Sequence, residues 1–126
     1  MVKGIGVDIV EINRLKLAMQ RRRRFLDKIF TPQEQAYCLS KSKPHLHFAV
    51  RFAAKEAVLK AFGTGFRGGI RWTDLEINHD SLGKPSVQLK GAAAENAKEQ
   101  GIGRILISLS FNHDKAVASA IALERE

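Results

Sequence analysis

The first residues of the chain alternate between aliphatic side chains and small or polar ones. In a strand over residues 3–12, Ile5, Val7 and Ile9 point to one face and Asp8 points to the opposite face. The glycines that share this second face leave space around Asp8. The pattern therefore predicts a strand that presents a carboxylate on the face opposite its aliphatic side chains.

Helical spacing of apolar residues follows in several segments. The first helix begins at Asn13. The next begins at residues 31–34 (TPQE), where Thr is a preferred N-cap, Pro fits the first helical position and Glu can complete a capping box; it ends near Ser40. A long helix is predicted over residues 45–62, and an alanine-rich helix over residues 91–100.

Strand patterns dominate the rest of the second half. Residues 73–78 and 86–89 flank a turn at 80–83 (DSLG), and residues 104–110 and 115–123 form another pair. The order of one strand, three helices, two strands, a helix and two strands favours an α+β fold, with a mainly antiparallel sheet packed against the long central helix. A chain of 126 residues is expected to form a single domain over 1–126.

The stretch RFAAKEAVLKAFGTG, residues 51–65, is unusually apolar for a helix with four charges: Arg51, Lys55, Glu56 and Lys60. Glu56 and Lys60 lie one turn apart beside alanines and form a shallow polar slot. The helix ends at Gly63, Thr64 and Gly65, where the glycines allow a left-handed cap and exposed N–H groups. Both a core helix with an ordinary ion pair and a binding site are compatible with these residues.

Composition excludes several classes of protein. Hydrophobic residues make up 44% and charged residues 27% of the chain, which is ordinary for a globular protein and argues against global disorder. No apolar stretch is long enough to span a membrane, and the first residues do not form a signal peptide. The single cysteine, Cys38, is consistent with a reducing compartment, so we expect a cytoplasmic location.

The formal net charge of +8 indicates an anionic partner, and much of the excess lies in Arg14, Lys16, Arg21, Arg22, Arg23, Arg24 and Lys28. The partner could be a nucleic acid, an acidic protein or a phosphate-rich small molecule. One alternative is therefore a small basic nucleic-acid-binding module that uses this arginine run and Trp72. Another is a structural or adaptor protein in which Asp8 and Glu56 are paired in the core.

Asp8 and Glu56 are the carboxylates with the strongest claim to chemistry. Two carboxylates, with waters and substrate phosphates completing the shell, are a common way for proteins to hold Mg²⁺. Lys60 and the amides of Gly63, Thr64 and Gly65 could contact phosphate oxygens. Cys38 lacks an oriented catalytic partner, the histidines lack zinc spacing, and His79 and His113, at predicted turns, are expected to be solvated.

Several motifs taken together resemble a known family. GIGVDIVEINR at the N-terminus, FTPQE at 30–34, RFAAKEAVLKAFGTG at 51–65 and LGKP at 82–85 are similar to the holo-[acyl-carrier-protein] synthases, a family of 4'-phosphopantetheinyl transferases. The C-terminal ISLSFNHDKAVASAIAL resembles the closing strand pair of that family. One departure stands out, because many members have a histidine, in contact with the phosphoadenosine end of the coenzyme, where this chain has Phe111.

The resemblance implies a Mg²⁺-dependent transfer of 4'-phosphopantetheine from coenzyme A to a serine of acyl carrier protein in fatty acid biosynthesis, with release of adenosine 3',5'-bisphosphate. Asp8 and Glu56 would hold the metal against the pyrophosphate. Lys60 would neutralise charge that develops on the phosphoryl oxygens. Either Glu56 or a metal-bound water could take the proton from the serine.

The resemblance also implies partners. Family members are homotrimers with active sites between protomers, so Arg51 and Lys55 would contact substrate phosphates or the neighbouring chain, and Gly63, Thr64 and Gly65 would lie along the coenzyme. Acyl carrier protein is acidic, and Arg14, Arg21 and Arg24 on the first helix would bind it. No membrane or nucleic-acid partner is expected under this interpretation.

Overall fold

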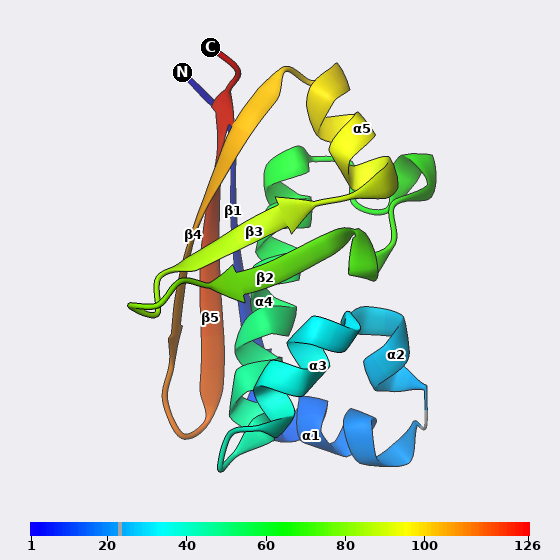
Figure 1. Cartoon of the computed structure of the whole chain (residues 1–126), viewed down its shortest axis with the longest axis vertical. Coiled ribbons are helices and arrows are strands. Elements are labelled where there is room, and N and C mark those ends of the chain that lie inside the picture. The colour runs from blue at the N-terminus through cyan, green and yellow to red at the C-terminus, as the bar shows by residue number, and fades with distance from the viewer. Residues whose placement is uncertain (23) are drawn as a thin grey trace.

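Two antiparallel sheets organise the protein (Figure 1). The computed structural model describes residues 1–22 and 24–126, so Arg23 of the basic run lies outside the described residues. The larger sheet has the order β1–β5–β4 and consists of β1 (Val2–Glu11), β4 (Ile102–Phe111) and β5 (Lys115–Glu124). The smaller pairs β2 (Leu75–His79) with β3 (Pro85–Leu89). The α+β class with antiparallel strands is confirmed, although the strands form two sheets where one was expected.

The helices follow the predicted order with one addition. They are α1 (Ile12–Arg21), α2 (Phe25–Ile29), α3 (Pro32–Leu39), α4 (Pro44–Phe62) and α5 (Gly91–Glu99), with 3₁₀ turns η1 (Arg67–Gly69) and η2 (Trp72–Asp74). The capping box of α3 is confirmed, since the Glu34 amide donates to Thr31 Oγ1 and the Thr31 amide donates to Glu34 Oε1. No helix among the described residues is long and apolar enough to cross a membrane.

The helix α2 was not predicted, and it corrects the expected placement of the arginines. The first helix ends at Arg21, because Arg22 has extended backbone angles (φ −115°, ψ 108°). Arg24 is the N-cap residue of α2. The basic run is therefore divided between two helices, and the expectation that Arg14, Arg21 and Arg24 share the first helix is wrong.

The long helix α4 packs closely against the inner face of the larger sheet. This face carries Gly4 and Gly6 on β1 and, opposite them in register, Ala122 and Ala120 on β5. A Cβ atom at Gly4 would collide with the carbonyl oxygen of Ala61, and one at Gly6 with that of Ala57. Small residues therefore allow the backbones of β1 and α4 to approach each other directly.

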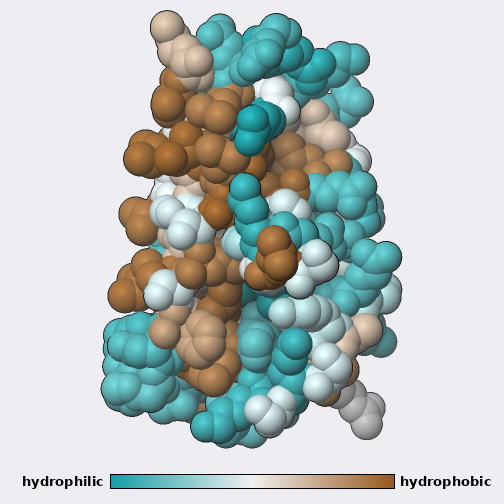
Figure 2. Space-filling view, turned by 60° about the vertical axis from the view of Figure 1, so that its left-hand side comes forward, coloured by the Kyte–Doolittle hydropathy of each residue, from teal (hydrophilic) through white to brown (hydrophobic). Residues whose placement is uncertain are grey.

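The outer face of the same sheet is apolar and open to solvent in the single chain. Ile5, Val7 and Ile9 are 73%, 59% and 64% exposed. Figure 2 shows a broad hydrophobic surface on the side of the molecule where the larger sheet lies. The predicted alternation is confirmed, because Asp8 faces α4 while the aliphatic side chains point away from it. The aliphatic face is thus not part of the core of the chain.

Candidate functional site

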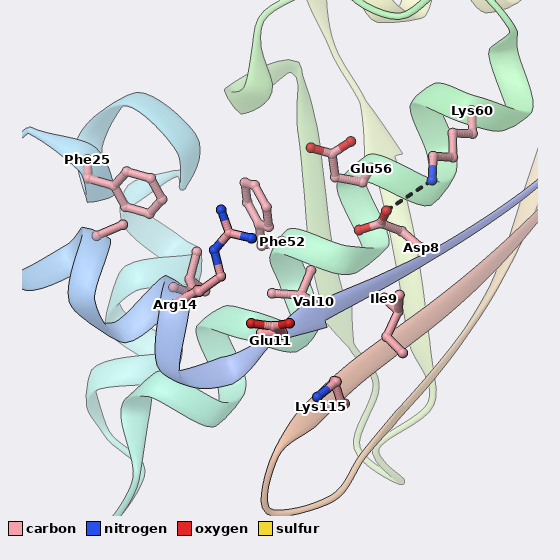
Figure 3. A pocket seen from close by; sticks show the side chains of 12 residues that line it. Asp8, Ile9, Val10, Glu11, Arg14, Phe25, Phe52, Glu56, Lys60 and Lys115 are labelled. Atoms are coloured by element: carbon pink, nitrogen blue, oxygen red, sulfur yellow. Dashed lines mark hydrogen bonds and ion pairs between the residues drawn. The ribbon is translucent and has the colours of Figure 1, made fainter.

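Close packing of β1 on α4 brings Asp8 to Glu56 and Lys60. Gly4 lies against Ala61 and Gly6 against Ala57, so the next inward-facing residue of β1, Asp8, reaches the turn of α4 that carries Glu56. The Lys60 ammonium donates to Asp8 Oδ1 at 3.0 Å and to the carbonyl of Val7 at 3.0 Å. All three charged side chains line one pocket (Figure 3).

The ion pair in this pocket differs from the predicted one. Lys60 pairs with Asp8, and no ion pair of Glu56 is found within residues 1–22 and 24–126. The pKa of Glu56 is raised, first because the carboxyl is partly buried and then because the charge of Asp8 lies nearby, while Lys60 opposes the shift. Glu56 is therefore a carboxylate whose ionised form lacks sufficient positive charge around it.

The lack of positive charge around Glu56 raises the question of whether a divalent cation fits between Glu56 and Asp8. The described residues contain no group of three or more His, Cys, Asp or Glu side chains that could hold a metal ion. The donor set is instead two carboxylates, which suits Mg²⁺ because this ion retains several waters and takes oxygens from substrate phosphates. A cation between Asp8 and Glu56 would relieve their mutual repulsion, so the residues fit Mg²⁺.

The pocket has a polar end and an apolar wall. Its volume is about 520 Å³. Asp8, Glu56 and Lys60 form the polar end, and Phe25 and Phe52 lie toward α1 and α2 (Figure 3). The rings of these two residues are 6.4 Å apart, and Phe52 also stacks on Trp72. Sequence reasoning missed both phenylalanines, because they come from different helices and no local pattern relates them.

The predicted left-handed cap at the end of α4 is confirmed. Gly63 has φ 75° and Gly65 has φ 60°. A Cβ atom at either position would meet nothing within 4 Å, so the backbone here borders open space. One polar side-chain atom of this turn, the buried Thr64 Oγ1, is left without a hydrogen-bond partner among the described residues.

The structure contradicts the expected contact of Lys55 with a substrate or a neighbouring chain. The side chain is completely buried, and its ammonium donates to Glu34 Oε1 at 2.6 Å, to the Ile29 carbonyl at 2.6 Å and to the Trp72 carbonyl at 3.2 Å. These contacts use all three donors of the ammonium group. Lys55 is thus a structural residue that connects α4 to α3 and to the segments around Ile29 and Trp72.

Arg51 is also buried, but its donors are not all used. Only 2% of the residue is exposed; Nη1 donates to the His47 carbonyl at 3.3 Å and Nη2 to His79 Nδ1 at 2.8 Å. Its Nε has no partner among the described residues. Arg51 lines a second pocket of about 360 Å³, together with Phe111. His79 is half-buried in this cluster, so the expectation that it is solvated is wrong.

Two of the three arginines expected to bind a partner line the main pocket or the pocket next to it. Arg14 belongs to α1 and lines the main pocket directly (Figure 3). Arg24 lines a neighbouring pocket that shares Phe25 with the main one and also includes Trp72. Arg21 is exposed at the end of α1. A partner that enters the main pocket along α1 would therefore meet positive charge.

Cys38 has the properties of an inert core residue. It is fully buried, and burial raises the pKa of its thiol to about 11, despite the lowering effect of the Arg51 charge. A thiol with such a pKa is almost entirely protonated at neutral pH and is a poor nucleophile. Cys38 is therefore not a candidate nucleophile.

Comparison with known proteins gives the class of enzyme first. Residues 4–119 match the 4'-phosphopantetheinyl transferase superfamily. A holo-[acyl-carrier-protein] synthase of a Geobacter species is 48% identical over 126 residues, which cover 99% of this chain and 100% of the relative. The chain therefore belongs to the holo-[acyl-carrier-protein] synthase family of this superfamily and is an enzyme.

Solved structures agree with this assignment. The holo-[acyl-carrier-protein] synthase of Neisseria meningitidis superimposes with a TM-score of 0.89 at 39% identity, over 98% of this chain and 100% of the other. The Chronobacterium ammoniagenes protein, solved as a complex with coenzyme A, has a TM-score of 0.84 at 28% identity, with 98% of each chain covered. The resemblance read from the sequence motifs is confirmed.

Proposed function

We propose that this chain transfers 4'-phosphopantetheine from coenzyme A to a serine of acyl carrier protein, in the cytoplasm and in support of fatty acid biosynthesis. In this reaction the serine oxygen forms a bond to the phosphorus of the pantetheine arm. The pyrophosphate bond breaks, and adenosine 3',5'-bisphosphate leaves. The observation that carries the proposal is the convergence of Asp8, Glu56 and Lys60 at one end of a pocket with an apolar wall.

In the proposed reaction Asp8 and Glu56 hold Mg²⁺. When bound, this ion polarises the phosphoryl oxygens and neutralises part of their charge. Lys60 keeps one ammonium donor beyond its two contacts with Asp8 and Val7, and this donor is suited to a phosphoryl oxygen. Either Glu56 or a water bound beside it would accept the serine proton.

The turn after α4 is proposed to bind the coenzyme. Gly63 and Gly65 border open space, and the buried Thr64 hydroxyl has no hydrogen-bond partner within residues 1–22 and 24–126. Because Lys60 lies in the last turn of α4, a phosphate that contacts its ammonium group would be close to this segment. Polar backbone groups can then approach the coenzyme without obstruction by side chains.

Arg14, Arg21 and Arg24 are proposed to bind the carrier protein, whose acidic surface complements the net charge of +8. Such contacts steer encounter and weaken as salt screens them. We expect the KM for carrier protein to rise several-fold between roughly 50 and 300 mM NaCl, with a much smaller change in kcat. A KM that stays constant across this range would argue against electrostatic docking.

The exposed face of the larger sheet supports assembly into a homotrimer. Large, contiguous apolar surfaces are rare on monomers and usually mark interfaces. Light scattering on the eluting peak of a gel-filtration column is expected to give three times the mass of one chain. Ile5→Asp places a charge on this exposed face and is expected to dissociate the assembly. A wild-type monomer at micromolar concentration would disprove the trimer.

The reaction is tested by intact mass spectrometry of the carrier. Apo-acyl carrier protein, coenzyme A and Mg²⁺ are incubated with the enzyme, and we expect the carrier to gain the mass of one phosphopantetheine group. A carrier in which alanine replaces the acceptor serine is the control for the site, and excess EDTA is the control for the metal. Absence of modification on several carrier proteins would disprove the proposed function.

A further inference from the structure

Arg51 is a buried cation without a carboxylate partner among the described residues. The ion pairs of the described chain involve Lys55, Lys60, Lys90 and Lys115 as the cations. A guanidinium group that is removed from water needs hydrogen-bond acceptors and a compensating charge. Within residues 1–22 and 24–126, Arg51 has two hydrogen-bond acceptors, and its Nε has none. A bound anion in the pocket that Arg51 lines would supply the missing negative charge.

One of the two acceptors is a histidine nitrogen, and this fixes the state of that ring. Arginine is always protonated and only donates hydrogen bonds. His79 Nδ1, at 2.8 Å from Arg51 Nη2, must therefore carry no proton. The pKa of His79 is lowered by burial and then by the charges of Arg51, His47 and Lys41, while Asp80 opposes the shift. The neutral ring is thus the stable form in this surrounding.

Tyr37 holds both groups in place. The His79 ring stacks on the Tyr37 ring with centroids 5.2 Å apart and planes 4° apart. Arg51 Cζ lies 4.2 Å from the same centroid, and Lys41 Nζ lies 4.6 Å from it. The arginine is therefore restrained by a ring face and by a hydrogen-bond acceptor. Such restraint is typical of a side chain prepared for one binding geometry.

We propose that His79 is a positioning residue, whose Nδ1 orients the Arg51 guanidinium to receive a phosphate group in the pocket lined by Phe111. The inference rests on the proposed function, because the phosphate is taken to be one of the coenzyme. The rings of His47 and Phe111 also line this pocket, and their centroids are 6.3 Å apart. The Phe111 side chain cannot donate a hydrogen bond to a phosphate in this pocket. Binding of the phosphate therefore depends on how the Arg51 guanidinium is oriented.

Two variants of His79 distinguish its role as a hydrogen-bond acceptor from its role in packing on Tyr37. His79→Asn keeps an oxygen acceptor close to the position of Nδ1 but removes the ring. His79→Phe keeps the ring that stacks on Tyr37 but removes the acceptor. His45→Phe is the matched control, because the charges that act on His45 are those of Lys16 and Lys43, not that of Arg51.

The probe is adenosine 3',5'-bisphosphate, with its Kd measured by calorimetry on the folded protein at about pH 8. We expect His79→Phe to weaken binding about tenfold and to raise the KM for coenzyme A with a smaller change in kcat. His79→Asn is expected to bind within about threefold of the wild type. Circular dichroism melting curves check that each variant is folded.

If His79→Asn bound the bisphosphate weakly and His79→Phe bound it as tightly as the wild type, the ring would act by packing. This result would overturn the proposal. Equal binding by all variants, equal loss in both, or no binding of the bisphosphate by an active wild-type enzyme would also overturn it. These results differ from failure of the proposed function, in which the wild type does not modify any carrier protein.

Discussion

Glu56→Gln is expected to lower transfer of phosphopantetheine by at least about 100-fold while the chain remains folded. Glutamine has nearly the same shape but cannot provide the second negative charge for Mg²⁺ or accept the serine proton. The side chain is only partly buried, so the substitution leaves packing almost unchanged. Initial rates of carrier modification at saturating Mg²⁺ and coenzyme A measure the effect.

Glu56→Gln is also expected to change the pH dependence of unfolding in the absence of metal. The pKa of Glu56 is raised in the folded protein from its ordinary value of 4.5. Its contribution to folding is therefore fully present below this value and is lost as the pH rises through the raised pKa. In metal-free buffer, this part of the pH dependence of unfolding is expected to disappear in Glu56→Gln, which should be slightly more stable than the wild type at neutral pH.

Glu95→Gln provides the matched control. Glu95 is exposed on α5 and does not line the main pocket. The activity of Glu95→Gln and the pH dependence of its unfolding should therefore equal those of the wild type. Full activity in Glu56→Gln would remove Glu56 from the proposed chemistry. Loss of activity together with loss of structure would instead show that the carboxylate supports the fold.

The polar end of the main pocket could be predicted because its residues lie in locally regular segments. The alternation around Asp8 and the helical spacing around Glu56 each fix a face, and the family motifs relate the two segments. The glycines on the face of Asp8 decide which face of β1 receives α4, because the helix backbone would collide with a Cβ atom there. The alternation itself does not show which face is covered.

Contacts between distant segments could not be predicted in this way. Lys55 meets Glu34 across 21 positions, and Arg51 meets His79 across 28. These pairs depend on how α3 and the β2–β3 hairpin pack on α4, and local spacing carries no information about that packing. The four charges of the central helix therefore divide differently than expected: Glu56 and Lys60 face the main pocket, Arg51 a second one, and Lys55 the interior.

Lys55→Met is expected to reduce the free energy of unfolding by about 3–5 kcal/mol. The substitution fills a similar volume but leaves the buried Glu34 carboxylate without its cation. It also leaves the carbonyl oxygens of Ile29 and Trp72 without the donor they share. Glu34 accepts bonds from the amides of Thr31 and Ile77 as well, so the loss would spread to α3 and β2. Urea unfolding followed by circular dichroism measures the change.

Two further variants separate this structural role from substrate binding. Lys60→Met, at the half-exposed pair with Asp8, should change stability by less than about 1 kcal/mol while strongly reducing activity. The double variant Lys55→Met, Glu34→Leu should recover much of the lost stability, because no buried charge is then left unpaired. If Lys55→Met unfolded like the wild type and instead raised the KM for coenzyme A, Lys55 would be a substrate ligand after all. The three donors of its ammonium group are already occupied inside the chain, so we expect the loss of stability to dominate.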